Sequence, residues 1–271
     1  MKKPFNKLNT QDIADILCMY YNKFSFKEIS NVLQISDRAI RRVLKEKGIS
    51  TRRKNRYIVR SNYFDNIKTE EQAYFLGLIY ADGFVGSSDF NNVSISLNIE
   101  DKYIIDLMTK QLVVYGLKPR LSKNKNMYVL NFSDKHMAET LRNKFKITQN
   151  KSIDLKSVLK EVPENLKRHT LRGYFDGDGA IFNRPSKSSF KKDDGSISTY
   201  IYYYKEISIC CTPSVALEFK NYLKMGYIVK TQNSKYVVYY NIYTQSEINL
   251  FYEIIYYNSS IYLERKHNGF I

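Results

Sequence analysis

Apolar residues recur at helical spacing three times within residues 10–47. The first helix is expected to follow Thr10, whose hydroxyl can cap the free backbone N–H groups of a first turn. Its apolar face consists of Ile13, Ile16, Leu17 and Tyr20. The second helix opens with Ser25 and Glu28, which have the spacing of a capping box. The pattern therefore predicts short, capped helices at the start of the chain.

The third predicted helix begins at Ser36 and ends at Gly48, where a left-handed C-cap fits. Only Gln34-Ile35 separates it from the second helix, so the two helices must turn sharply against each other. The stretch FKEISNVLQISDRAIRRVLKEKGI resembles the helix-turn-helix of resolvases and invertases, except that Gln34 replaces the usual glycine of the turn.

In such a module the third helix enters the major groove of DNA. The resemblance implies a DNA-contacting face formed by Arg38, Arg41, Arg42 and Lys45. The alternative is a three-helix bundle with a solvated basic face that binds protein. The basic run that follows has no apolar period, and it predicts either a solvated linker or an arm laid along phosphates or in a minor groove. Its basic residues are Arg52, Arg53, Lys54 and Arg56.

The remainder of the chain repeats one order of predicted elements: helix, two strands, helix, two strands, helix. Residues 95–98 (ISLN) match residues 207–210 (ISIC), and residues 128–132 (YVLNF) match residues 238–242 (VYYNI). The polar stretch 183–200 occurs only in the second copy and predicts an exposed hairpin. The pattern predicts an α+β protein with two pseudo-symmetric αββαββα halves, preceded by a small all-α helix-turn-helix domain.

The pattern also predicts where the chain divides into domains. The expected parts are a helix-turn-helix domain (1–50), a basic linker (51–69), a first half (70–147), a linker between halves (148–169) and a second half (170–271).

The balance of charge narrows the class of partner. Forty-three Lys and Arg residues against 27 Asp and Glu residues give a net charge of +16. A polyanion is the natural partner, because each neutralised phosphate releases condensed counterions. Charge alone does not separate DNA, RNA, the ribosome and anionic membrane surfaces. No stretch of 18 uncharged apolar residues exists, so we expect no segment that spans a membrane.

Two runs of small and apolar residues, AYFLGLIYADGFVG from Ala73 and LRGYFDGDGAIF from Leu171, each end in Asp-Gly. Within each run, two small residues are four apart, so each helix carries a narrow small-residue stripe on one face. Two such helices can approach backbone to backbone. The small residues are Gly77 and Ala81 in the first run, and Gly173 and Gly177 in the second.

That packing would bring Asp82 and Asp178 side by side at two helix C-termini. Two carboxylates there repel each other unless a cation lies between them, and oxygen ligands favour a hard divalent ion such as Mg²⁺. A metal held beside a basic surface suits in-line displacement at a phosphate. One Asp-Gly alone would indicate a C-cap turn, and Lys187 at the twelfth position from Asp176 excludes an EF-hand loop.

The stretches FLGLIYADG and LRGYFDGDG resemble the two motifs of a single-chain LAGLIDADG homing endonuclease. The resemblance covers roughly residues 70–271. It implies that the eighth motif residues, Asp82 and Asp178, bind metal together with the backbone at Ala81 and Gly177. The sixth motif position, which varies more, is Tyr80 in the first copy and Asp176 in the second.

The resemblance further implies that the two sheets form a saddle over duplex DNA. A monomer would cut both strands of a long, asymmetric target across the minor groove and leave short 3′ overhangs. The implied cofactor is Mg²⁺ or Mn²⁺, with Ca²⁺ able to occupy the site without cleavage. Outward strand residues would read the major groove, namely Ser94, Ser96, Asn98, Tyr202, Tyr204, Glu206 and Ser208.

The resemblance also implies polar and basic residues that order the attacking water. Asn131 and Asn241 correspond across the repeat, and Lys151 and Lys266 follow the two halves. In a chain this basic, an ordinary phosphate or surface contact is the alternative role for either lysine.

Two other functions stay open. A maturase would use the same fold to bind intron RNA, although the helix-turn-helix argues against it. A transcription regulator would keep the fold without cleavage, although the intact pair Asp82 and Asp178 favours cleavage. The ending NGFI lacks the His-Asn junction of an intein, so we expect an intron-encoded or free-standing gene.

The expected location is intracellular, wherever the target DNA is: a bacterial or phage-infected cytoplasm, or an organelle. The basic start of the chain has no apolar core behind it, so we expect no signal peptide and no secretion. An odd number of cysteines, Cys18, Cys210 and Cys211, also favours a reducing compartment.

Overall fold

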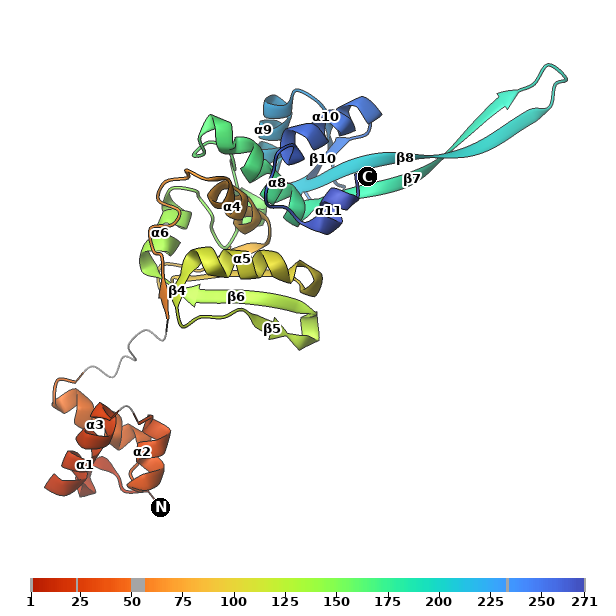
Figure 1. The fold of residues 1–271 in the computed structure, drawn as a ribbon. Helices are drawn as coiled ribbons and strands as arrows, with labels where there is room; N and C mark the ends of the chain where they lie inside the picture. Colours follow the sequence, from red (N-terminus) through yellow and green to blue (C-terminus); the bar gives the residue numbers. More distant parts are fainter. Residues whose placement is uncertain (1, 23, 50–56, 233, 271) are drawn as a thin grey trace. The chain divides into compact units, whose positions relative to one another are not determined.

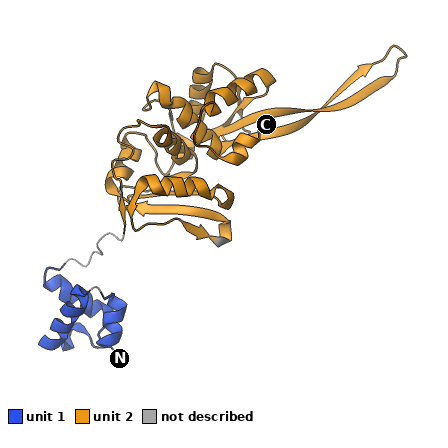
Figure 2. Cartoon of the chain, in the orientation of Figure 1, with its two compact units in different colours: residues 1–56 blue, residues 57–271 orange. Residues whose placement is uncertain are grey.

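The computed structural model describes residues 2–22, 24–49, 57–232 and 234–270. The chain divides into two compact units, Met1–Arg56 and Tyr57–Ile271 (Figure 2). Each unit buries a hydrophobic core of its own, and each is described by itself.

The first unit is helical, as predicted. It contains η1 (Phe5–Lys7), α1 (Thr10–Tyr21), α2 (Phe26–Val32) and α3 (Asp37–Glu46). The helices converge on a small core whose fully buried members include Ile16, Ile29, Ile35, Ile40 and Leu44.

The helix starts follow capping chemistry. Ser25 and Glu28 form the predicted capping box of α2. The predicted cap of α1 is wrong by one residue: Asn9, not Thr10, is the N-cap. The Asn9 side chain accepts from the backbone N–H of Asp12 at 2.8 Å, and the Asp12 carboxylate accepts from the backbone N–H of Asn9 at 2.8 Å. These two bonds satisfy the backbone N–H groups of Asn9 and Asp12. A cap at Thr10 would have to replace this capping box.

The turn between α2 and α3 is tight. Gln34 adopts a positive φ of 54°, the left-handed conformation that a glycine would adopt without strain. The Ser30 hydroxyl donates to the carbonyl of Ile35 at 2.6 Å, which ties the two ends of the turn together. Gly48 has a φ of 65° after α3, as the sequence predicts.

The second unit consists of two halves with the same order of elements, which confirms the predicted α+β class and the αββαββα pattern (Figure 1). The first half contains α4 (Glu70–Asp82), β2 (Gly83–Val85), β3 (Asn92–Asn98), α5 (Lys102–Leu112), β5 (Arg120–Ser122), β6 (Met127–Ser133) and α6 (Lys135–Asn143). The second half contains α8 (Lys167–Asp178), β7 (Gly179–Lys191), β8 (Ile197–Cys211), α9 (Pro213–Leu223), β9 (Tyr227–Lys230), β10 (Val238–Ile242) and α10 (Gln245–Tyr256).

The two four-stranded antiparallel sheets have equivalent orders, β2-β3-β6-β5 and β7-β8-β10-β9. A separate pair joins β1 (Ile58–Val59) to β4 (Val113–Tyr115). The short helices are η2 (Ile99–Asp101), η3 (Lys123–Lys125), α7 (Lys151–Asp154), η4 (Glu164–Leu166) and α11 (Glu264–Asn268).

Strand register corrects one part of the predicted repeat. Gly83 pairs with Ile95, and its equivalent Gly179 pairs with Ile209. Ile95 therefore corresponds to Ile209, so the predicted match with Ile207 is wrong by two residues. Side chains alternate with a period of two, so the sequence pattern looks the same after such a shift.

The longest hairpin is formed by β7 and β8, which extend beyond the helices of the second half (Figure 1). Its turn closes through Lys192, whose N–H donates to the carbonyl of Ser196 at 2.8 Å. The predicted hairpin within residues 183–200 is thus confirmed. Because β7 spans 13 residues and β2 only three, the second half carries a ribbon that the first half lacks.

The predicted linkers are shorter in the structure. Residues 57–69 belong to the second unit, since β1 pairs with β4 and Phe64 is fully buried in the main core. The predicted linker 148–169 contributes Leu155 and Leu159 to that core, and its end forms the first turn of α8. Isolated apolar residues attach residues 57–69 and 148–169 to the core. Because these residues follow no helical or strand period, the hydrophobic pattern does not reveal them.

Among the helices of the described residues, none is long and apolar enough to cross a membrane.

The two central helices, α4 and α8, touch backbone to backbone. A Cβ atom added at Gly77 would lie 2.1 Å from the carbonyl oxygen of Thr170 in α8. One added at Gly173 would lie 2.1 Å from the carbonyl oxygen of Tyr74 in α4. Real Cβ atoms cannot approach so closely, so the stripe of small residues predicted from the sequence is what permits this contact.

We expect Gly77→Ala to lower the free energy of unfolding of the second unit by about 3 kcal/mol, because the methyl group must push α4 and α8 apart. Thermal unfolding of the full chain measures the change. Gly195→Ala is the control: its added Cβ meets nothing within 4 Å, so only its φ of 83° costs energy, about 1 kcal/mol. Equal losses in the two variants would contradict a backbone-to-backbone interface.

Candidate active site

The C-terminal ends of α4 and α8 bring the two predicted acids together. Asp82 is the last residue of α4, Asp178 is the last residue of α8, and a glycine that starts a strand follows each. A Cβ atom added at Gly177 would lie 3.0 Å from the Asp82 carboxylate and would overlap the Cβ of Ala81. The carboxylate of one half therefore rests against the last turn of the motif helix of the other half.

The two acids carry raised pKa values. Desolvation raises the pKa of Asp178 to about 6, and the negative charge of Asp82 adds to the effect. Desolvation also raises the pKa of Asp82, although that residue keeps an exposed surface. Nearby lysines oppose both shifts. Ionising both carboxylates in this partly desolvated place costs free energy. A bound cation would reduce that cost.

The two predicted lysines lie at the same place. Lys151 of α7 donates from Nζ to the carbonyl of Tyr80 at 2.5 Å and also to the carbonyl of Ala81. Lys266 of α11 donates from Nζ to the carbonyl of Gly179. Burial lowers the pKa of both lysines, while the charges of Asp82 and Asp178 act in the opposite direction. Each lysine thus reaches the end of the motif helix of its own half.

The donor set fits a hard divalent cation. Asp82 and Asp178 offer carboxylate oxygens, and Ala81 and Gly177 have equivalent backbone positions one residue earlier. The Ala81 carbonyl already accepts from Lys151, so one of its two lone pairs is engaged. Within the described ranges, no cluster of three or more His, Cys, Asp or Glu side chains is suited to a metal. One or two carboxylates completed by water and phosphate oxygens are typical of Mg²⁺.

Space for a substrate group lies beside Lys266. A cavity of about 350 Å³ opens there, between the start of β7 and α11. Its lining residues are Ala180, Ile181, Asn183, Arg265, Lys266 and Gly269. The only charged groups in this lining are cationic, which suits an anionic group such as a phosphate.

The sixth motif residues are part of the protein interior. Asp176 is fully buried and accepts from the hydroxyls of Tyr74 at 2.7 Å and Tyr256 at 2.5 Å, and from the N–H of Leu263 at 2.7 Å. Burial raises its pKa to about 6. Tyr80, the equivalent residue, donates to the carbonyl of Phe145 at 2.9 Å. This position therefore fixes each motif helix and does not face the paired acids.

The two predicted asparagines differ in their surroundings. Asn131 is exposed and pairs with Ser94 across the first sheet. Asn241 is only 8% exposed; its amide donates to Glu206 and its oxygen accepts from Ser208, both at 2.8 Å. Only Asn131 is open to a water or a ligand.

The predicted base-reading residues divide into an open and a closed group. Glu206 and Ser208 are only 7% and 8% exposed, so their predicted place on an open face is corrected. Asn241 bonds to both Glu206 and Ser208, and Arg184, which was not predicted from the sequence, donates to Glu206. The spacing of Arg184 along β7 could have revealed it. The residues that stay at least partly accessible are Ser94, Ser96, Asn98, Tyr202 and Tyr204.

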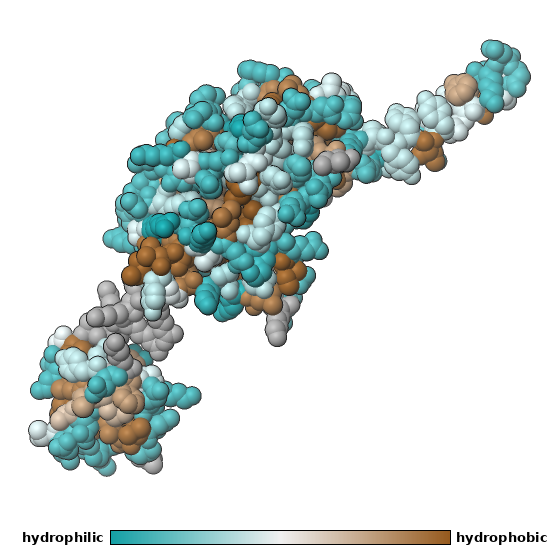
Figure 3. Space-filling view, viewed as in Figure 1, coloured by the Kyte–Doolittle hydropathy of each residue, from teal (hydrophilic) through white to brown (hydrophobic). Residues whose placement is uncertain are grey.

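The β7–β8 hairpin exposes several aromatic and apolar side chains among polar ones, and its visible face is mostly pale with a few brown residues (Figure 3). Tyr203 is 73% exposed; the rings of Phe190 and Tyr200 form an edge contact with centroids 6.3 Å apart, and the rings of Tyr200 and Tyr202 are tilted at 6.0 Å. Exposed aromatic residues on a ribbon favour contact with another molecule.

In the first unit, the basic side chains of α3 are all exposed. The guanidinium of Arg41 lies 4.4 Å above the ring of Phe26, and that of Arg42 lies 4.2 Å above the ring of Phe5. Arg38 and Lys45 are exposed on the same helix. The predicted arm residues lie outside the described residues: Arg52, Arg53, Lys54 and Arg56.

The chain matches no protein-family model, and no curated protein matches it in sequence. Solved structures are similar to it at low identity. The LAGLIDADG homing endonuclease I-SmaMI bound to cleaved DNA is 14% identical, with a TM-score of 0.49 over 76% of this chain and 87% of that chain.

Two further structures are similar to this chain. I-AabMI bound to uncleaved DNA is 14% identical, with a TM-score of 0.48 over 73% of this chain and 86% of that chain. I-LtrWI bound to target DNA is 13% identical, with a TM-score of 0.46 over 74% and 88% of the two chains.

The raised pKa of Asp178 predicts how stability depends on pH. Its folded pKa of about 6 exceeds the unfolded value near 4, so the folded state binds the proton more tightly. Without divalent metal, the stability of the second unit should therefore fall as pH rises from about 4 to 6.

Asp178→Asn should remove that loss, raising stability at pH 7.5 by on the order of 1–2 kcal/mol after solvent screening, with little change at pH 4. Mg²⁺ should raise the Tm of the wild type and leave that of Asp178→Asn nearly unchanged. Asp106→Asn, in the exposed part of α5, is the control. If Asp178→Asn were equally stabilised at pH 4 and at pH 7.5, ionisation of Asp178 would not be the cause of the stability loss.

Proposed function

We propose that this protein is a site-specific, Mg²⁺-dependent double-strand DNA endonuclease of the LAGLIDADG homing type. One observation carries the proposal: two motif helices pack backbone to backbone and end in Asp82 and Asp178, with Lys151 and Lys266 beside them. This arrangement combines paired acids with two lysines of lowered pKa, which suits the metal-assisted hydrolysis of a phosphodiester.

In the reaction, the oxygen of a water attacks phosphorus, one P–O ester bond breaks, and the leaving oxygen acquires a proton. Asp82 and Asp178 would hold Mg²⁺, which when bound supplies a Lewis acid and lowers the pKa of its water. Lys151 and Lys266 face the negative charge that develops on the phosphoryl oxygens. Because burial lowers their pKa, they also release a proton more readily than an exposed lysine does.

The pseudo-symmetry of the second unit matches the symmetry of the substrate. The two strands of a duplex are antiparallel and related by local twofold axes. Two equivalent lysines at the ends of two equivalent helices can therefore act on one strand each. Cleavage of both strands across the minor groove would leave the short 3′ overhangs that the sequence resemblance implies.

The outward face of each sheet is the proposed DNA surface. Ser94, Ser96 and Asn98 line it in the first half, and Tyr202 and Tyr204 continue it along the hairpin in the second. A two-stranded ribbon fits the major groove of B-DNA. The hairpin is longer than its counterpart by about ten residues at about 3.3 Å each, close to one turn of duplex. A long target, extended on one side, follows from this difference.

The first unit would add affinity or further base contacts through Arg38, Arg41, Arg42 and Lys45 of α3. The net charge of +16 supports binding of a polyanion by the whole chain. We propose that the protein acts as a monomer, in the compartment that holds its target DNA.

Cleavage of a plasmid library that carries randomised and host-locus DNA tests the proposal. Wild type with Mg²⁺ should linearise plasmids at one long site, and EDTA should stop the reaction. Asp178→Asn should slow it by on the order of a thousandfold or more, because one acid of the pair is lost. Asp106→Asn is the matched control on an exposed surface and should cut like the wild type.

Other outcomes would identify the two alternative functions. Tight, salt-sensitive duplex binding without cleavage would contradict the nuclease and indicate a regulator. Preference for structured RNA would indicate a maturase. A selected site of equal length on both sides of the cut would contradict the role given to the hairpin.

A further inference from the structure

We infer that each of the two lysines is positioned by the opposite half of the protein, through a clamp on the segment that carries it. The inference rests on the proposed endonuclease function and assigns positioning roles to Asp101, Tyr103 and Glu218. Its consequence is that loosening one clamp slows the cleavage of one DNA strand and not the other.

The first clamp holds α11, which carries Lys266 and follows the second half. Arg265 donates from Nε to the carboxylate of Asp101 at 3.0 Å. Asp101 belongs to the first half, where it directly precedes α5, and it is only 2% exposed. A buried carboxylate with a single cationic partner depends on that partner, so this ion pair fixes Arg265. Lys266 is the next residue along the chain.

Tyr103 completes the first clamp. Its hydroxyl donates to the carbonyl of Tyr262 at 2.7 Å and accepts from the N–H of Glu264 at 2.6 Å. One side chain of the first turn of α5 therefore bonds to the backbone on both sides of Leu263, at the start of α11. The entry of α11 is thereby held against the first half.

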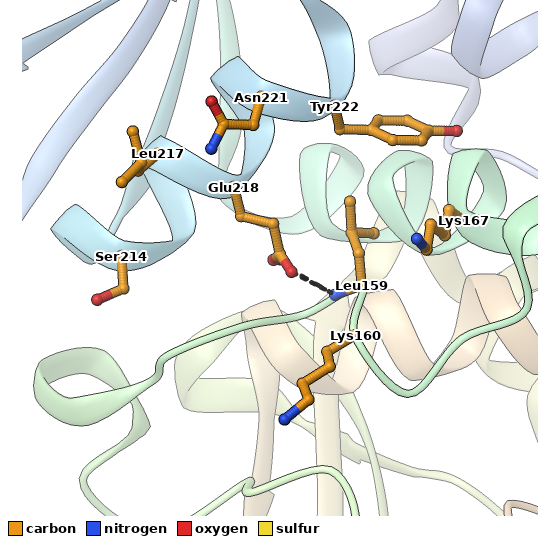
Figure 4. Close-up of a pocket in the computed structure, with 8 residues that line it drawn as sticks. All are labelled: Leu159, Lys160, Lys167, Ser214, Leu217, Glu218, Asn221 and Tyr222. Carbon is orange, nitrogen blue, oxygen red and sulfur yellow. Dashed lines mark hydrogen bonds between the residues drawn. The ribbon is translucent and has the colours of Figure 1, made fainter.

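The second clamp holds the segment that follows Lys151. Glu218 of α9, in the second half, accepts from the N–H groups of Val158 at 2.8 Å and Leu159 at 3.3 Å, and from the hydroxyl of Ser157. Figure 4 shows the Glu218 carboxylate pointing at the backbone of Leu159. The segment is thereby tied to the helix of the opposite half.

A further bond secures the same segment. Thr212, the N-cap of α9, donates from its hydroxyl to the carbonyl of Leu155 at 2.6 Å. Leu155 directly follows α7, the helix of Lys151.

The two clamps are equivalent. Each starts from the helix that follows the first strand pair of a half, α5 or α9, and each grips the segment that carries the lysine of the other half. That segment needs external support, because α7 has four residues and α11 has five, and helices so short are not stable alone. A displacement of about 1 Å at a reacting group can cost on the order of a hundredfold in rate.

Two conservative variants test the inference on the target that the cleavage library selects. Tyr103→Phe removes both bonds of one hydroxyl, and Glu218→Gln removes the charge that gathers three donors. With a duplex labelled on each strand in turn, we expect Tyr103→Phe to slow one strand by on the order of tenfold and Glu218→Gln to slow the other. Nicked plasmid should accumulate in both, with unchanged DNA affinity.

Matched controls separate positioning from general damage. Tyr115→Phe on β4 and Glu253→Gln on α10 change exposed side chains of the same types and should leave both strands unaffected. Asp101→Asn should slow the same strand as Tyr103→Phe. Amide exchange should rise near residues 262–266 in Tyr103→Phe and near residues 155–159 in Glu218→Gln.

Three results would overturn the inference, provided that the wild type cuts. They are equal slowing of both strands, no slowing of either strand, and slowing of the same strand by Tyr103→Phe and Glu218→Gln. Absence of cutting by the wild type itself would overturn the proposed function instead, and the inference with it.

Discussion

The contact between α4 and α8 is the constraint on which the second unit depends. Gly77 and Gly173 let the two helices touch backbone to backbone, so the helices run at a separation that no larger residue permits. Both helices end in an aspartate, and Gly177 of α8 lies against Ala81 and Asp82 of α4. The backbones that carry the two acids cannot move apart without losing this contact. Desolvation, together with the negative charge of Asp82, raises the pKa of Asp178 there, and a bound cation would relieve this cost.

The two halves that meet at this contact differ from each other in several places. At the sixth motif position, Tyr80 bonds to one backbone carbonyl, whereas Asp176 gathers three donors in the core. Asn131 is open, whereas Asn241 is enclosed by Glu206 and its neighbours. Only the second half extends a long hairpin. The paired acids thus occupy equivalent positions in the two halves, whereas the sheets that follow them differ in length and in their side chains.

Sequence alone predicted the features with short-range or repeated signals: the capping box of α2, the two motif helices, the order of elements and the hairpin. It missed those set by long-range pairing. The register between β3 and β8 was wrong by two residues because alternation is unchanged by such a shift. Burial of Glu206 depends on Arg184 and Asn241 from neighbouring strands, and Phe64 joins the core without any local period. Asp101 and Glu218 form bonds across the two halves that no spacing reveals.

The most direct measurement of the central claim is anomalous diffraction from crystals of the full chain grown with Mn²⁺ and duplex target. We expect a manganese peak between Asp82 and Asp178, about 2.1 Å from an oxygen of each carboxylate. Lys151 and Lys266 should flank it. A manganese ion bound elsewhere, or two carboxylates that turn away from each other with no ion between them, would contradict the account.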